Sequence, residues 1–280
     1  MGVLGYGFYA SNIAVGREPV ARVDQKVITA RELVKRLKQG GQNLPPGELQ
    51  VRASLALERM QTEELLQNGT RRLGLTASPQ EIETAIKASL NLKEGEEGKF
   101  PEVYAKLLKD VRLSDQEYRQ VVEVNILINK LRQHLDAQIP QETEFFHLLG
   151  IQLKDATTAQ NLWEILTRGE DFAVVAQASL DEESKAKGGD MGWLPRGLRP
   201  ELEAAFDLEL GALSQPISTP DGFHYILKLA GKETRPVDPD TRKKLLENAL
   251  ESWLEQERKQ QGVETLLSSK RLAWVVAQAR

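Results

Sequence analysis

The chain has 280 residues, of which 40% are hydrophobic and 28% charged, and its formal net charge is −4 at pH 7. This length fits one large or two ordinary domains, and the composition favours a packed core over disorder. The net negative charge argues against nucleic acid as the main partner. The chain has no cysteine and its histidines are scattered, so we expect no disulfide and no bound metal.

The N-terminal segment, residues 1 to 19, begins with a stretch that is apolar and uncharged up to Val15. This stretch is too short to span a bilayer, and it lacks the basic start of a signal peptide. One interpretation is a loose or docked terminus, and the other is the remnant of a membrane anchor or signal segment. Tyr6, Phe8 and Tyr9 resemble an interfacial aromatic belt, which favours the remnant and a membrane tether.

Residues 20 to 139 have the pattern of a mostly helical region. A β-hairpin is predicted from Pro19 to Ile28, and Thr29 with Glu32 forms a capping box for the helix that follows and ends near Gly40-Gly41. Helical spacing of apolar residues and capping signals predict further helices: residues 48 to 73 with a stop at Gly74, a helix starting at Ser78-Pro79, and a helix from Ser114 to about Ala137, with a solvated loop at 91 to 99. No catalytic constellation accompanies these helices.

Residues 140 to 233 follow a boundary at Ile139-Pro140 and mix strands with short helices. The predicted elements are a strand at 144–153, a helix at 156–168, a helical stretch at 172–178, a loop ending in the GGDMGW run at 188–193, a helical stretch at 200–208, a strand at 215–218, a turn at 219–222 and an alternating strand at 223–229.

The C-terminal segment, residues 234 to 280, starts with a linker at 234–240 that carries charges and two prolines. A charged helix follows at 241–261, and an apolar tail runs from 263 to 280. Trp253 and Trp274 lie on the apolar faces of these stretches, so they need a partner surface from elsewhere in the chain.

Four blocks of residues 140 to 233 occur in the order found in one family. They are Gly169-Glu170-Asp171-Phe172, the GGDMGW run, Ala205-Phe206 with Gly211, and Thr219 to His224 with the strand after it. This ordered set resembles the parvulin family of peptidyl-prolyl isomerases. The resemblance implies a small antiparallel sheet surrounded by helices, without a cofactor.

The hairpin and capped helices of residues 20 to 139 look like the N-terminal chaperone module of SurA/PrsA-type foldases. In such proteins a C-terminal segment returns to complete this module, and the resemblance implies the same for residues 234 to 280. The expected fold class is therefore α+β, with a parvulin-like domain and a mostly α-helical chaperone domain built from the N- and C-terminal segments.

The resemblance also names a site for turning an X-Pro bond, whose barrier is about 18–20 kcal/mol. Such a site grips the proline ring in an apolar pocket and needs no covalent step. Asp181 matches a loop position beside the twisting bond, with Glu182 as a rival, and His224 matches a strand histidine that orients the site. The residues matching substrate-binding positions are Met191, Leu198, Leu202, Phe206, Thr219 and Asp221.

The first strand departs from the family pattern, which has a histidine there. Matching the local motif assigns this position to His147, as a third catalytic residue, whereas counting back from Gly169 without a gap assigns it to Gly150. The two positions are three residues apart, so in a regular strand they face opposite sides of the sheet. A β-bulge would reconcile them.

These observations predict an extracytoplasmic folding factor, located at the cell surface or in the periplasm. One hypothesis is a prolyl isomerase acting on proline-containing segments of unfolded or extended client polypeptides. The alternative is a holdase whose parvulin-like domain is catalytically weak and only binds peptides. A plain interaction scaffold without client binding is the third class, and the sequence leaves the oligomeric state open.

Overall fold

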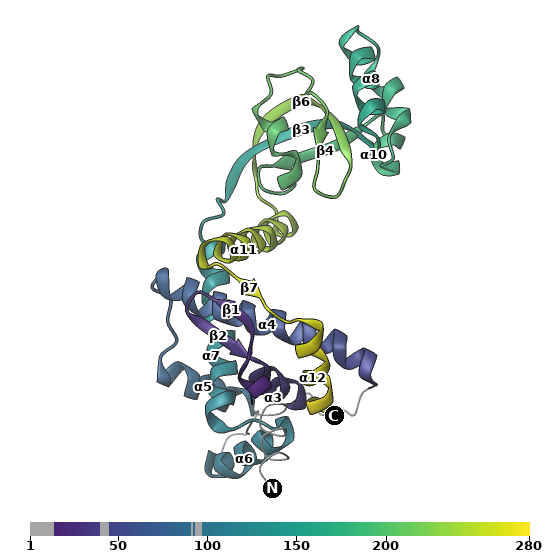
Figure 1. Ribbon diagram of the computed structural model, residues 1–280. Coiled ribbons are helices and arrows are strands. Elements are labelled where there is room, and N and C mark those ends of the chain that lie inside the picture. The colour runs from purple at the N-terminus through teal and green to yellow at the C-terminus, as the bar shows by residue number, and fades with distance from the viewer. Residues whose placement is uncertain (1–13, 40–44, 91, 93–96) are drawn as a thin grey trace. The chain divides into compact units, whose positions relative to one another are not determined.

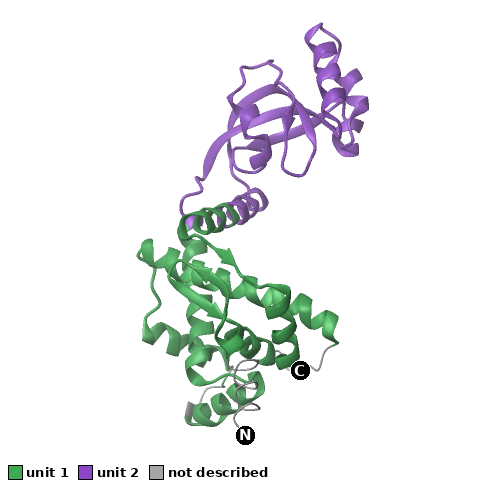
Figure 2. Cartoon of the chain, viewed as in Figure 1, with its two compact units in different colours: residues 1–134, 251–280 green, residues 135–250 purple. Residues whose placement is uncertain are grey.

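A computed structural model describes residues 14–39, 45–90, 92 and 97–280. The expected anchor remnant, the helix end at Gly40-Gly41 and most of the loop at 91–99 lie outside or partly outside these residues. The chain divides into two compact units, Met1–His134 with Glu251–Arg280 and Leu135–Leu250 (Figure 2). In the part of the chain that the structure describes, no helix is long and apolar enough to cross a membrane.

The first unit contains a small antiparallel sheet in the order β2-β1-β7. It is built from β1 (Pro19–Val23), β2 (Lys26–Thr29) and β7 (Glu264–Thr265), after a single helical turn, α2 (Val15–Arg17). The β1–β2 turn carries Asp24 at φ 51°, a left-handed conformation that aspartate tolerates. The predicted capping box is confirmed, because the Thr29 backbone N–H donates to the Glu32 carboxylate at 2.7 Å at the start of α3 (Ala30–Gln39).

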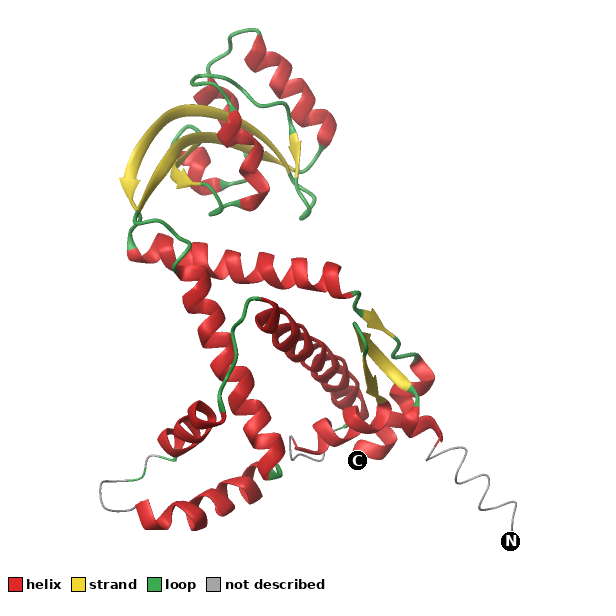
Figure 3. Cartoon of the chain, turned by 90° about the vertical axis from the view of Figure 1, so that its left-hand side faces the viewer, coloured by secondary structure: helices red, strands yellow, loops and turns green. Residues whose placement is uncertain are grey.

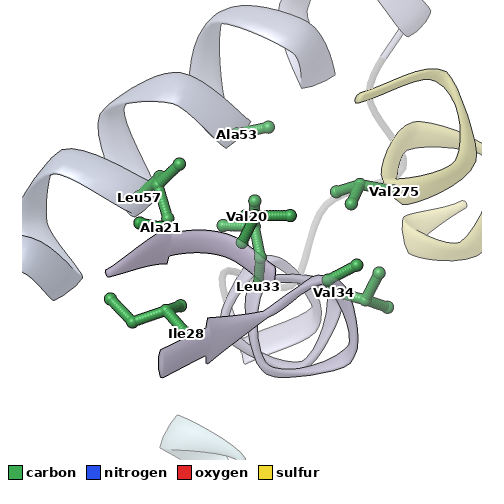
Figure 4. Packing of buried hydrophobic residues seen from close by; sticks show 9 residues of the cluster. Val20, Ala21, Ile28, Leu33, Val34, Ala53, Leu57 and Val275 are labelled. Atoms are coloured by element: carbon green, nitrogen blue, oxygen red, sulfur yellow. The ribbon is translucent and has the colours of Figure 1, made fainter. Parts of the chain in front are cut away.

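The core of the first unit joins residues from both ends of the chain (Figure 4). The sheet packs with α3, the long helix α4 (Pro46–Arg72) and the C-terminal helix α12 (Ser269–Ala279). Val20, Leu33 and Val275 are each fully buried there. Trp274 lies against Gly16, where an added Cβ would be 3.1 Å from the indole ring. Close apposition of this kind is possible because glycine has no side chain.

Three further helices form a second apolar cluster in the first unit. They are α5 (Pro79–Ser89), α6 (Phe100–Val111) and α7 (Asp115–Asp136). The short 3₁₀ helix η2 (Glu97–Lys99) directly precedes α6. Ile86, Tyr104 and Val122 are buried in this cluster. Ser78 caps α5 at the predicted helix start, and with Glu81 it makes a reciprocal capping box, which satisfies backbone donors that a helix start leaves unpaired.

The C-terminal half of α11 (Pro239–Gln261) packs on α4 within the first unit. Gly69 of α4 faces Trp253, whose ring would lie 2.6 Å from a Cβ at that position. Two buried polar residues line the same contact: Glu257 pairs with Arg72, and Gln261 donates from Nε2 to the Leu65 carbonyl oxygen at 3.2 Å. Paired in this way, the polar groups avoid the penalty of unsatisfied burial.

The second unit is organised on a four-stranded antiparallel sheet in the order β4-β3-β6-β5 (Figures 1 and 3). Its strands are β3 (Glu142–Leu153), β4 (Asp190–Pro195), β5 (Ile217–Ser218) and β6 (His224–Pro236). The expected linker start at residue 234 is wrong, because β6 stays paired with β3 as far as Pro236 opposite Glu142. Proline fits at this last position, where the ladder ends.

Each face of this sheet carries its own apolar cluster. One face packs on the 3₁₀ helix η4 (Pro200–Asp207), and the other packs on α8 (Ala156–Thr167), α9 (Phe172–Val175) and the 3₁₀ turn η3 (Ala176–Ala178). A short helix, α10 (Glu182–Ala186), leads into β4. Strand alternation sets which side chains reach which face, because successive residues point to opposite sides. We call the two faces of the sheet the η4 face and the α8 face, after the helices that pack on them.

Candidate functional site

The η4 face holds most of the residues matched to a proline pocket. Leu202 and Phe206 are both fully buried there, on η4, and they pack with Leu148 of β3 and Leu227 of β6. The ring of Phe206 lies 4.7 Å from that of Phe146. Burial of this extent makes Leu202 and Phe206 the floor of the apolar face, because neither has surface left for a ligand.

Met191 is the predicted pocket residue that combines contact with this cluster and partial exposure. It forms a β-bulge, because the pairing of β4 with β3 steps from Gly192 to Asp190 and leaves Met191 without a partner. Its Sδ lies over Gly150, where an added Cβ would be only 2.2 Å away. Gly150 therefore faces the η4 cluster, and Met191 fills the space that a side chain at position 150 would occupy.

His147 does not join this pocket. Its neighbours Phe146 and Leu148 both pack into the η4 cluster, so alternation directs His147 to the α8 face. The sheet has two irregularities nearby, but the extra residues lie in β4 and β6, not in β3. Bulges in the partner strands leave the alternation of β3 intact, so His147 and Gly150 stay on opposite faces. His147 instead contacts Asp190, with its Nε2 at 2.8 Å from Oδ1.

A polar group borders the η4 face beyond Gly150. Gln152 of β3 donates from Nε2 to the Tyr225 hydroxyl at 2.6 Å, and these two residues pair directly across β3 and β6. Burial raises the pKa of Tyr225, so its hydroxyl stays protonated at neutral pH. Arg199, next to η4, pairs with Glu201; burial lowers the pKa of Arg199, but the hydrogen bonds and charges of Glu201 and Tyr225 together raise it. Sequence reasoning missed Gln152 and Arg199, since no local pattern marks either.

Asp181 caps α10, where its carboxylate accepts a hydrogen bond from the Glu183 backbone N–H at 3.2 Å. Its own N–H donates to Ser179 Oγ at 3.2 Å, and the same oxygen accepts the Gln152 backbone N–H at 3.0 Å. The loop is thus tied to the end of β3 beside Gln152. Glu182, the rival position, is exposed as the first residue of α10.

His224 lies on the α8 face of β6. The residues on either side of it, Phe223 and Tyr225, pack into the η4 cluster, and its cross-strand partner Leu153 packs with α8. Its Nδ1 lies 3.0 Å from Ser218 Oγ on the neighbouring strand. The structure therefore brings neither His224 nor His147 to the side of the sheet that carries Met191.

The turn before β6 is fixed by Thr219 and Asp221. The buried Thr219 hydroxyl hydrogen-bonds to the Asp221 carboxylate, which lowers the pKa of Asp221. The Phe223 carbonyl oxygen accepts the Thr219 N–H at 2.9 Å, closing the turn. This arrangement presents the Phe223 ring at the border of the η4 cluster, and Lys154 Nζ lies 4.3 Å from the ring centre. Thr219 and Asp221 thus shape the turn that holds Phe223.

Leu198 is half-buried in the segment between β4 and η4. Its carbonyl oxygen accepts a hydrogen bond from Asn248 Nδ2 of α11 at 3.0 Å, and the Gly197 carbonyl oxygen accepts from the same group at 2.8 Å. The backbone here is held by α11.

The described residues contain no cluster of three or more histidine, aspartate or glutamate side chains that would hold a metal ion.

Comparison with known proteins identifies two domains. Residues 1–132 match the model of the SurA-like N-terminal domain, and residues 152–230 match that of the PPIC-type PPIASE domain. The foldase protein PrsA of Caldanaerobacter subterraneus subsp. tengcongensis is 33% identical over 158 residues, which cover 55% of this chain and 45% of that protein. The chaperone SurA of Thiobacillus denitrificans is 29% identical over 245 residues, covering 76% of this chain and 56% of that protein.

Among solved structures, a peptidylprolyl isomerase (PrsA) from Bacillus anthracis is 24% identical with a TM-score of 0.47, and the match covers 73% of this chain and 96% of that one. The chain spans about half the length of the curated relatives it matches. The chain thus combines a SurA-like N-terminal domain with a parvulin-type (PPIC-type) peptidyl-prolyl isomerase domain, and it is related to the PrsA and SurA proteins.

Proposed function

We propose that this chain is an extracytoplasmic folding factor that catalyses cis/trans isomerisation of X-Pro bonds in unfolded client polypeptides. The observation that carries the proposal is the placement of Met191. It is a partly exposed apolar side chain on a bulge, above a fully buried floor that includes Leu202 and Phe206. A proline ring binds against such a surface because ring and surface are both apolar.

The physical task of this site is to weaken amide resonance, which sets the barrier of about 18–20 kcal/mol. Met191 grips the ring and keeps water from the amide, while polar groups stabilise the twisted bond. Gln152 and Tyr225 stand at the border of the η4 face, and Asp181 lies in the loop tied to Gln152. These groups supply the polar side of the site in our proposal, since Gly150 offers no imidazole.

The test is the exchange rate between the cis and trans forms of a proline peptide, measured by NMR with and without the full chain. Catalysed exchange that rises in proportion to protein concentration supports the proposal. Exchange at the uncatalysed rate, under conditions where the peptide binds, contradicts it.

A holdase is the second candidate, and two observations favour it. Neither His147 nor His224 lies on the side of the sheet that carries Met191, and the first unit has a cleft of about 350 Å³ between β2, α3, α4 and α7. The cleft is lined by apolar residues such as Ile28, Met60 and Val121 and by charges of both signs. Suppressed aggregation of an unfolded client, without any catalysed proline exchange, would favour this function over the isomerase.

A further inference from the structure

We infer that His147 is a positioning residue, which holds Asp190 and through it the bulge that carries Met191. The inference rests on the proposed isomerase function and assigns His147 a role behind the pocket rather than at the twisting bond. It starts from the pair His147–Asp190, which lies on the opposite side of the sheet from the η4 cluster.

The carboxylate of Asp190, the residue before Met191, accepts two hydrogen bonds. An ionised carboxylate only accepts hydrogen bonds, so His147 Nε2 carries the proton and donates to Oδ1 at 2.8 Å. The same oxygen accepts the Gly192 backbone N–H at 2.7 Å. Asp190 and Gly192 flank Met191, and Gly192 has a φ of 78°, a left-handed conformation that suits glycine. Two hydrogen bonds therefore connect the imidazole to the Gly192 backbone, next to Met191.

The imidazole is itself held in place by stacking. Its ring lies 5.1 Å from that of Trp193, with an angle of 17° between the planes. Trp193 rests on Gly231 of β6, where an added Cβ would be 2.9 Å from the indole ring, and the Arg235 guanidinium lies 3.9 Å from the ring centre. A ring fixed by packing donates its hydrogen bond from one direction, which is what a supporting residue must do.

The charges around the pair keep Asp190 ionised. Burial alone would raise the pKa of Asp190, but hydrogen bonds from Gly192 and His147 and the nearby charge of Lys187 lower it. Arg235, over Trp193, also pairs with Glu233. The acceptor of the His147 hydrogen bond is thus present at neutral pH.

Position 150 explains why the bulge needs this support. Gly150 has no side chain that could hold Met191 in place. The Met191 sulfur occupies the open space above the glycine. A bulge that is free to rearrange would let Met191 leave this space, and a loosened contact residue lowers the rate of a site that works by positioning.

The experiment compares three variants of the full chain. His147→Leu removes the donor, and His147→Gln keeps a side-chain N–H able to reach Asp190. Leu210→Ala, at an exposed position of the same unit, is the control. Two readouts are used: kcat/KM for a proline peptide, and the ¹³C-methyl resonance of Met191, which reports the bulge whether or not the chain is an enzyme.

We expect His147→Leu to lower kcat/KM about tenfold, the effect of losing one hydrogen bond to a charged group, and to shift or broaden the Met191 resonance. His147→Gln and Leu210→Ala should resemble wild type in both readouts. An unchanged Met191 resonance in His147→Leu, or a loss in His147→Gln equal to that in His147→Leu, overturns the inference.

Two further outcomes separate the inference from the proposed function. If wild type has no isomerase activity, the proposed function fails while the Met191 resonance still decides the positioning role. If His147→Leu does not fold, hydrogen exchange at the Gly192 amide replaces it: protection in wild type and in His147→Gln supports the role, and rapid exchange in wild type contradicts it.

Discussion

Gly150 and Met191 occupy one space, since a Cβ on Gly150 would lie 2.2 Å from Met191 Sδ. The finding explains how a strand without a histidine at this position keeps a filled apolar face. A substitution at position 150 therefore tests the site, because any side chain there must displace the methionine.

Gly150→Ala should therefore lower kcat/KM for a proline peptide while leaving the fold in place. The new methyl group meets the far end of a flexible side chain, so Met191 moves and the backbone does not. Parallel assays and thermal melts check this. Gly47→Ala, in the first unit, is the control, because nothing lies within 4 Å of a Cβ added there. Equal activity losses in the two variants would contradict the assignment of Gly150 to the pocket.

Leu202→Ala should separate stability from binding. Leu202 is fully buried, so its truncation removes core contacts and should lower the free energy of unfolding by about 2–5 kcal/mol. Met191→Ala should destabilise less, since Met191 is partly exposed, but should weaken proline-peptide binding more. Urea unfolding and peptide titration measure the two effects. If Leu202→Ala weakened peptide binding more than Met191→Ala and destabilised the fold less, the ligand contact would lie at Leu202.

The second unit should fold alone when its boundaries follow the structure. A fragment of residues 135–250 keeps all of β6 and the hydrogen bonds from Asn248 to the Gly197 and Leu198 carbonyl oxygens. Residues 140–233 form the shorter fragment that the sequence predicts as a domain, but its end cuts β6. Thermal melts should show cooperative unfolding for both and a higher Tm for 135–250. A lower or equal Tm for the longer fragment would show that the added ends do not contribute.

The core of the first unit should depend on α12. Val275→Asp places an uncompensated charge among fully buried residues, which is strongly destabilising, whereas Ala277→Asp on the same helix is exposed. Limited proteolysis of the full chain should cleave residues 20 to 139 faster in the first variant only. Unchanged resistance in Val275→Asp would mean that the helix does not stabilise that segment.

The link between α3 and α7 should weaken in acid. Lys35 Nζ donates to the Glu117 carboxylate at 2.7 Å, and this bond, with those from Ser114, lowers the pKa of Glu117 from 4.5 to about 2. A lowered folded-state pKa gives stability that is present above the unfolded pKa and lost as pH falls through the folded one. Glu117→Gln should therefore show a shallower decline of the urea midpoint between about pH 5 and 2. Glu102→Gln, an exposed carboxyl on α6, should decline like wild type.

Local signals in the sequence were sufficient for much of the fold. The Thr29 and Ser78 capping boxes lie at the predicted helix starts, because capping depends on residues within one turn. The two-residue strand β7 carries no such signal, and its pairing with β1 comes from the opposite end of the chain. The extent of β6 was likewise underestimated, since its last residues are charged or proline and are recognised as strand only through β3.

For the candidate site, the sequence could predict only which residues of one strand share a face of the sheet. Alternation places His147 and Gly150 on opposite faces, but only the structure tells which face carries Met191. That answer depends on the bulge in β4, a feature of pairing between strands some 40 residues apart that no local pattern encodes. The Gln152–Tyr225 hydrogen bond is long-range in the same sense.

The most direct test of the account is the cis/trans exchange of a proline peptide with wild type, Met191→Ala and Leu210→Ala. Leu210 is an exposed apolar residue of the same unit and serves as the matched control. The account predicts catalysis by wild type and Leu210→Ala, and a loss of at least about tenfold in Met191→Ala at a nearly unchanged Tm. Equal catalysis by all three proteins, or none by wild type, would contradict it.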